Sequence, residues 1–262
     1  AFCAVVGGLV AGILAISIWA SFITRWPYNL NLTLANYRFG EFDSDGWKAY
    51  WNSIKMAGWT ALIGTVVVFV GAWLIEKTRA FATGRLLAQF VTMLPMAVPG
   101  LVLGLAYIFF FNAKGNPLGF LYATMAILVI NSITHFYTVS HLTATTALKQ
   151  LDAEFEAVSA SLKVSLLRTM TRVSVPVCLP AVLDISIYLF VNAMTTVSAV
   201  VFLYSTETKL SAISIIHMDE GGFTAAAAAM AVTIVATSAT VKVVHLLITR
   251  RLNRRTQAWR RR

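Results

Sequence analysis

Six long stretches with almost no charged residue constrain the fold of this chain more than any other feature. Crossing the ~30 Å hydrocarbon core of a bilayer takes an α-helix of about 20 mostly apolar residues, and each stretch is that long. Because lipid offers the peptide backbone no hydrogen-bond partner, helices are the expected form. The predicted spans are 1–24, 56–75, 86–111, 119–139, 177–204 and 223–247.

The overall composition excludes an ordinary soluble domain. Only 12% of the 262 residues are charged and 58% are hydrophobic, whereas a soluble domain carries about 25% charged residues. The alternation of apolar and polar residues that marks a membrane β-barrel is also absent. We therefore predict an all-α, polytopic membrane protein with six transmembrane helices in a single domain, residues 1–262.

The distribution of Lys and Arg predicts the orientation in the membrane. If the N-terminus is cytoplasmic, the loops and tail on that side hold fifteen of the 21 Lys and Arg residues, as the positive-inside rule requires. The basic tail, residues 250–262, is typical of a cytoplasmic anchor that meets anionic lipid heads, and we expect no nucleic-acid partner. We predict a multi-pass protein of a bacterial inner membrane with both termini cytoplasmic.

Motifs of self-contained catalysis are absent from the sequence. There is no Gly-Lys pair, hence no phosphate-binding P-loop, and neither H-E-x-x-H nor G-x-S-x-G occurs. Cys3 and Cys178 have no metal-ligand or disulfide spacing. We therefore predict no catalytic residue, no metal site and no bound cofactor.

The inner segment 140–176, between the fourth and fifth spans, is longer than packed helices need for a connection. Acidic residues open a helical pattern there, where the helix dipole favours anions. Apolar residues then recur at i, i+3 and i+7. The pattern consists of Asp152, Glu154 and Glu156, then Phe155, Val158 and Leu162, and ends at Pro176. It predicts a short helix with one apolar face, which either docks on a protein or rests on the membrane surface.

This segment resembles the EAA loop of permease subunits of binding-protein-dependent ABC importers. The resemblance rests on Glu156-Ala157-Val158, on Leu162 and on the run Val-Ser-Val-Pro at 173–176. Val158 replaces the second Ala of the motif, and Leu162 or Lys163 stands where the family has Gly. In that family the loop forms a coupling helix that docks in a groove of a cytoplasmic ATPase. The implied coupling residues are Asp152, Glu154, Phe155, Glu156, Ala157, Val158, Leu162, Lys163 and Pro176.

A wider resemblance, to permeases of 2-aminoethylphosphonate importers, covers nearly the whole chain. It rests on phrases such as WPYNLNLTLANYRF and LPMAVPGLVLGLAYIFFFN. It implies a type I importer fold and a phosphonate substrate. The implied partners are a cytoplasmic ATPase dimer that uses ATP and Mg, a second permease half and a periplasmic binding protein. Some of those permeases are double-length, so the resemblance also fits the C-terminal half of a fused chain.

Other transport functions stay open. Related permeases carry polyamines, ferric iron or other anions. A stand-alone secondary transporter or channel is the alternative from another class. It would require ion-coordinating residues at mid-membrane and no large docking loop, the reverse of the pattern seen here.

Polar residues inside the spans are candidates for the translocation path, because an ionisable group is costly there. Asp184, Tyr188, Asn192 and Thr196 follow one another at steps of four along the fifth span. In the fourth span, Asn131 and His135 share a face in the same way. Hydrogen bonding between helices is the alternative role, with Arg172 as a possible partner of Asp184.

The third span contains Pro95 and Pro99, which lack backbone N–H groups, and Gly100 and Gly104, which lack side chains. These residues predict a bent or broken helix. A simple packing kink would explain the bend. A bend that lines or gates a path is the functional alternative.

Overall fold

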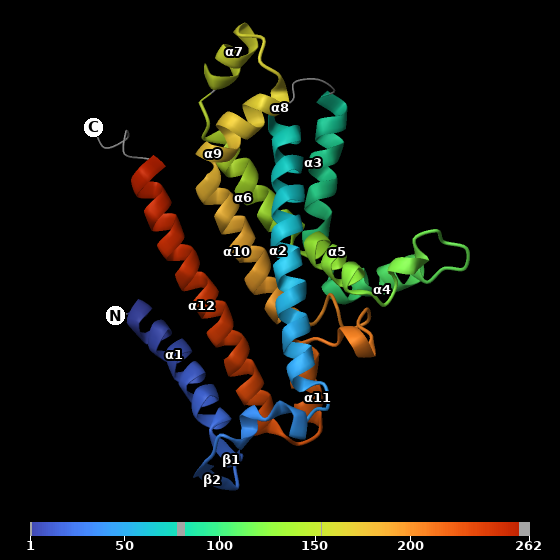
Figure 1. Cartoon of the computed structure of the whole chain (residues 1–262), viewed down its shortest axis with the longest axis vertical. Coiled ribbons are helices and arrows are strands. Elements are labelled where there is room, and N and C mark those ends of the chain that lie inside the picture. The colour runs from blue at the N-terminus through green and yellow to red at the C-terminus, as the bar shows by residue number, and fades with distance from the viewer. Residues whose placement is uncertain (1, 78–81, 153, 257–262) are drawn as a thin grey trace.

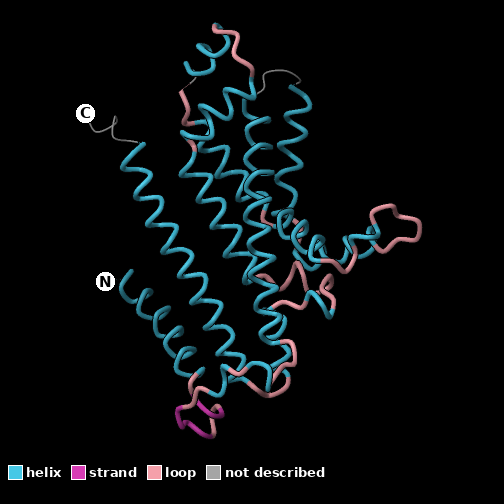
Figure 2. The backbone as a smooth tube through the Cα atoms, in the orientation of Figure 1, coloured by secondary structure: helices cyan, strands magenta, loops and turns pink. Residues whose placement is uncertain are grey.

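The computed structural model describes residues 2–77, 82–152 and 154–256, which form an elongated helical bundle with one small β-hairpin (Figure 1). Helix α7 lies at one end of the bundle, and the hairpin and α11 lie at the other (Figures 1 and 2). The helices are α1 (Phe2–Ser21), α2 (Gly46–Lys77), α3 (Ala82–Ala97), α4 (Gly100–Phe111), α5 (Met125–His135), α6 (Tyr137–Lys149), α7 (Glu154–Ser161), α8 (Leu166–Thr169), α9 (Val175–Val177), α10 (Leu179–Thr195), α11 (Ser211–Glu220) and α12 (Thr224–Thr256).

Short elements complete the described chain. Strands β1 (Ile23–Arg25) and β2 (Asn29–Leu32) pair antiparallel, with Ile23 opposite Leu32. A π-helical turn, η4 (Met170–Ser174), joins α8 to α9. Four 3₁₀ turns lie at η1 (Ala35–Tyr37), η2 (Phe39–Glu41), η3 (Gly119–Leu121) and η5 (Thr206–Thr208).

The six predicted spans are found if each bent helix pair counts as one. Helices α1, α2 and α12 are each long and apolar enough to cross a bilayer. The other three spans are broken: α3 and α4 meet at 111°, α5 and α6 at 56°, and the segment Leu166–Val177 meets α10 at 77°. The prediction of a polytopic, all-helical membrane protein is confirmed.

Several predicted boundaries were wrong. Helix α2 begins at Gly46, ten residues before the predicted span 56–75, because its first turns pack against other parts of the protein at the hairpin end of the bundle. The fifth span was predicted to reach residue 204, but α10 ends at Thr195 and residues 196–204 form turns. Helix α11 was not predicted at all. It is short, carries two acidic residues at its end, and buries most of its first turn against α2.

The predicted inner segment 140–176 is mostly helical. Helix α6 continues through its first ten residues to Lys149, and α7, α8, η4 and α9 follow. Of the predicted basic tail, residues beyond Thr256 lie outside the described part of the chain.

Helix α2 is the centre of the bundle and packs against α5, α6, α10 and α11. Small residues on its buried face, including Ala57, Ala61 and Ala72, allow neighbouring helices to approach closely. At Gly64, a Cβ atom would lie 2.8 Å from the Cδ1 atom of Leu189 on α10. The missing side chain of Gly64 therefore makes room for the Leu189 side chain and lets α10 pack closely on α2.

A buried ion pair ties the hairpin end of the bundle together. The Lys209 ammonium donates to both carboxylate oxygens of Asp43, at 2.7 and 2.9 Å. Burial alone would raise the pKa of Asp43, but the hydrogen bonds it accepts, first of all from Lys209, hold it below the ordinary 3.8. Nearby, the Asn52 amide donates to the carbonyls of Glu207 and Lys209. These contacts fix the segment before α11 to the start of α2.

We predict that Lys209→Met lowers the free energy of unfolding by about 3 kcal/mol, because it leaves the Asp43 carboxylate buried without a counter-charge. Thermal unfolding in detergent measures the loss. Since the pKa of Asp43 is depressed by folding, the contribution of this pair is complete above about pH 4 and disappears as the pH falls below it.

The matched control is Lys48→Met. Lys48 pairs with Glu207 at 2.8 Å, but both side chains are exposed, so solvent screens the pair and the expected loss is much smaller than in Lys209→Met. Equal losses in the two variants would contradict the structural role of the buried pair.

Candidate functional site

Helix α7 stands apart from the bundle at one end of the molecule (Figure 1). Its start is fixed by Asp152, whose carboxylate accepts a hydrogen bond from the Glu154 N–H at 3.0 Å, the pattern of a helix N-terminus. The side chains of Glu156 and Ala157 lie outside the described part of the structure. The predicted short helix is therefore present, and an acidic residue caps it.

An apolar face of α7 and the turn after it lies open. Phe155, Val158 and Leu162 follow at the predicted helical spacing, and each side chain is about half exposed or more. A contiguous exposed apolar face on a short, charged helix is unusual unless a partner covers it. The geometry therefore suits a helix that docks into a groove.

Helix α7 ends in a left-handed turn at Lys163, whose φ is +51°. The Val164 N–H donates to the Ser159 carbonyl at 2.9 Å across this turn, as in a Schellman C-cap. Such a position favours glycine, because a Cβ atom costs about 1–2 kcal/mol there. Of Leu162 and Lys163, the two positions predicted to correspond to the family's glycine, Lys163 has the backbone conformation that favours glycine.

We predict that Lys163→Gly stabilises the end of α7 by about 1 kcal/mol. Amide hydrogen exchange in α7 should then slow by roughly fivefold. Ser161→Gly is the control, because it places glycine inside the helix and should speed exchange. Faster exchange in Lys163→Gly would show that the left-handed turn is not what limits this helix.

The segment after α7 is anchored to the bundle. The Trp73 indole on α2 donates to the Ser174 hydroxyl in η4 at 3.0 Å, and both groups are buried. Pro176 lies at the start of the short helix α9, where its missing N–H costs nothing. Helix α10 begins directly after this segment, so α7 is connected to a spanning helix through a buried joint.

The predicted polar stripe on α10 is not one continuous surface. Asp184 is the exposed member, with 56% of its side chain accessible, and lies 3.5 Å from the His245 ring on α12. Tyr188 packs edge-on against Phe136. Asn192 donates to the Tyr188 carbonyl within the helix. Thr196, the last member of the stripe, is buried.

The suggested partner of Asp184 was wrong: its carboxylate lies 3.5 Å from the His245 ring, not beside Arg172. Arg172 is exposed in η4. The His245 contact could not be predicted directly from the sequence, because the two residues lie on different helices. The only hint was that His245 is an ionisable residue inside a predicted span.

Asn131 and His135 lie on α5, the first half of the fourth span. Asn131 is fully buried, and its amide donates to the Ala199 carbonyl in the turn segment 196–204. The ring of His135 packs against Phe136, and its Cε1 atom lies next to Gly100. Two roles were proposed for these residues: lining the translocation path, or hydrogen bonding and packing between elements. The second role describes Asn131 directly.

The predicted bend is the break between α3 and α4. Pro95 lies inside α3 and Pro99 precedes the first residue of α4. A Cβ atom at Gly100 would lie 2.5 Å from the Ser198 hydroxyl, and one at Gly104 would lie 2.9 Å from the Ala199 carbonyl. The two glycines thus let α4 pack directly on the backbone of segment 196–204.

No group of three or more His, Cys, Asp and Glu residues that could hold a metal ion occurs in the part of the chain that the structure describes. The candidate site therefore consists of the exposed helix α7, the buried contact between η4 and α2, and the broken spans.

Comparison with known proteins identifies the family. Residues 68–256 match the model of the binding-protein-dependent transport system inner membrane component, and the chain belongs to that family. The family is a transport component of the inner membrane, which agrees with the bent multi-pass architecture.

Two curated relatives are ferric transport system permease proteins. The chain is 35% identical over 211 residues to FbpB of Actinobacillus pleuropneumoniae, which covers 78% of this chain and 29% of the relative. It is 35% identical over 199 residues to putative FbpB 1 of Haemophilus influenzae, which covers 73% and 30%. The chain thus spans less than a third of the length of these relatives.

The fold is also similar to that of a solved structure, a bacterial ABC transporter involved in the import of the acidic polysaccharide alginate. The TM-score is 0.73, and the alignment covers 93% of this chain and 95% of the other at 14% identity. This likeness establishes the type I importer permease fold.

Proposed function

We propose that this chain is the membrane-spanning permease of an ATP-driven importer, with α7 as the coupling helix that docks on a cytoplasmic ATPase dimer. The observation that carries the proposal is the exposed apolar face of α7, held away from the bundle. The chain runs from α7 through η4 and α9 into α10, and the buried Trp73–Ser174 contact ties η4 to α2. ATP and Mg are used by the ATPase, and this chain binds no cofactor. The end of the bundle with α7 is then cytoplasmic.

The complete importer requires further partners. One chain with six spans forms half of the membrane-spanning part, so a second permease half completes the path. That half is a second copy, a homologue or another portion of a longer chain. The family description supports a periplasmic binding protein as the component that delivers the substrate.

We predict that Phe155→Ser weakens binding of the ATPase to the reconstituted permease by about tenfold or more, because a large aromatic side chain at the centre of an interface is a typical hot spot. ATP-driven uptake should fall with it. Binding in nanodiscs and uptake in vesicles provide the two measurements.

The matched control is Phe120→Ser. Phe120 is also an exposed phenylalanine, but it lies in η3 beyond α4, on the arm that projects from the side of the bundle (Figure 1). ATPase binding should be unchanged. If the wild type and Phe155→Ser bind the ATPase equally well, α7 is not part of the coupling interface.

The substrate we propose is 2-aminoethylphosphonate. The support is the resemblance of long phrases throughout the chain to permeases of that class. Ferric iron is the second candidate, supported by the names of the relatives at 35% identity. With no metal-binding cluster among the described residues, either solute would be selected by the binding protein and passed through a weakly attractive path.

We predict that 2-aminoethylphosphonate stimulates ATP hydrolysis by the reconstituted permease, ATPase and cognate binding protein. The same complex without the binding protein is the control and should not respond. If ferric iron stimulates ATP hydrolysis and 2-aminoethylphosphonate does not, the substrate is ferric iron and the importer assignment still holds. A complex that assembles but responds to neither solute would contradict both substrates.

A further inference from the structure

The length and exposure of helix α1 indicate where the membrane boundary lies. It contains 20 residues, of which only Ser21 is buried, and it packs along α12. At 1.5 Å per residue α1 is about 30 Å long, which matches the hydrocarbon thickness of a bilayer. The end of α1 at Ser21 therefore lies at the border between lipid tails and head groups.

The β-hairpin emerges at this border, directly after α1 (Figure 1). The Thr33 N–H donates to the Phe22 carbonyl and fixes the second strand to the end of the helix. Side chains alternate between the two faces of a strand. Leu30 and Leu32 therefore share one face of β2, while Asn29 and Asn31 occupy the other. Leu34 follows the strand and lines the same pocket as Leu32; these three leucines are called the leucine face.

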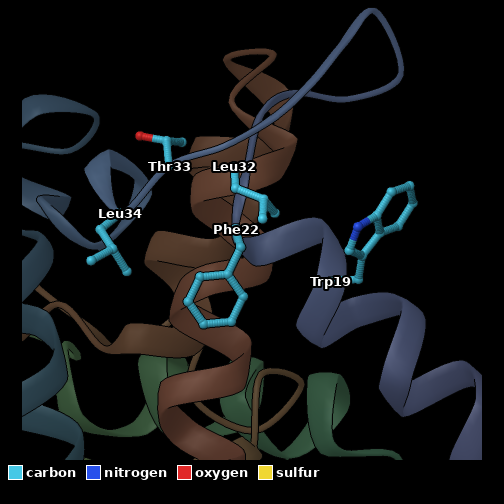
Figure 3. Close-up of a pocket in the computed structure, with 5 residues that line it drawn as sticks. All are labelled: Trp19, Phe22, Leu32, Thr33 and Leu34. Atoms are coloured by element: carbon cyan, nitrogen blue, oxygen red, sulfur yellow. The ribbon is translucent and has the colours of Figure 1, made fainter.

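The leucine face is open to an unusual degree. Leu32 is 75% exposed and Leu34 is 72% exposed, although apolar side chains are normally covered when they lie in a row. Together with Trp19, Phe22 and Thr33 they line a groove of about 480 Å³ (Figure 3). Four of the five lining residues are apolar, so the groove suits a hydrocarbon group.

We propose that this hairpin is an interfacial lipid-binding element, with the leucine face and the groove holding the upper part of a phospholipid acyl chain. The groove is continuous with α1, whose exposed apolar surface is the part of the protein that lipid tails cover. The opposite face of β2, with Asn29 and Asn31, stays in the head-group water.

Charge and aromatic residues support lipid over a protein partner. Arg25 is the only charged residue in the run FITRWPYNLNLTL at 22–34, and its guanidinium can bind a lipid phosphate. Trp26 packs edge-on against Trp19, with ring centroids 5.7 Å apart. Tryptophan and tyrosine are the residues enriched at membrane–water borders. The free edges of a two-stranded hairpin also need water, so the hairpin fits the interface and not the hydrocarbon core.

Spin labelling of the two faces tests the proposal. Cys3 and Cys178 are first replaced by alanine, and single cysteines are then placed as Leu32→Cys or Asn31→Cys in the assembled permease in phospholipid nanodiscs. Accessibility of each label to oxygen, which concentrates in lipid, is compared with accessibility to a water-soluble nickel chelate. The label at 32 should favour oxygen, and the label at 31 should favour nickel.

Two results would overturn the proposal. If both labels favour nickel, the hairpin is a water-exposed loop. If the label at 32 is shielded from both reagents, a protein covers this face. Quenching of tryptophan fluorescence by lipids brominated near the head group is a second readout that does not depend on labelling. Trp26→Phe should reduce that quenching, and an unchanged signal would likewise contradict the proposal.

Discussion

A backbone carbonyl or amide within the bilayer must find its hydrogen-bond partner inside the protein. The predicted fifth span shows how this is done, because α10 ends at Thr195 and residues 196–204 form turns. In this segment the requirement is met by local turns and by Asn131, which donates to the Ala199 carbonyl. Gly104 brings α4 close enough to cover the same carbonyl. This irregular segment is therefore possible because neighbouring elements enclose it.

The molecule has a tightly packed part, around α2 and α10, and an open part, α7, that can couple to a partner. The small residues of α2 hold α10 at close range, and the Asp43–Lys209 pair closes the hairpin end. Helix α7, in contrast, has an open apolar face and is connected to the bundle through η4. Between α7 and α10 the chain passes through η4, which the buried Trp73–Ser174 hydrogen bond ties to α2. Under the proposed coupling role, a movement of α7 would act on both of these spanning helices.

Sequence predicted the spans well because the bilayer imposes length and polarity on each of them separately. Where a helix ends inside the membrane depends on contacts between distant residues. Residues 196–204 are as apolar as a helix, and only the contact with Asn131, 68 positions away, indicates that they form turns. The partner of Asp184 was missed for the same reason. By contrast, α7 was predictable, since its charge pattern and apolar period are local, and Lys163 was one of the two positions expected for the missing glycine.

If α7 is the surface by which an ATPase moves this permease, position 158 lies against the ATPase. Photo-crosslinking from a benzoylphenylalanine residue at position 158, in the assembled transporter, tests this contact. We expect a crosslink to the ATPase subunit, and none from the same residue placed at position 120. Crosslinks from position 158 to lipid alone would show that α7 rests on the membrane surface, and the coupling role would be wrong.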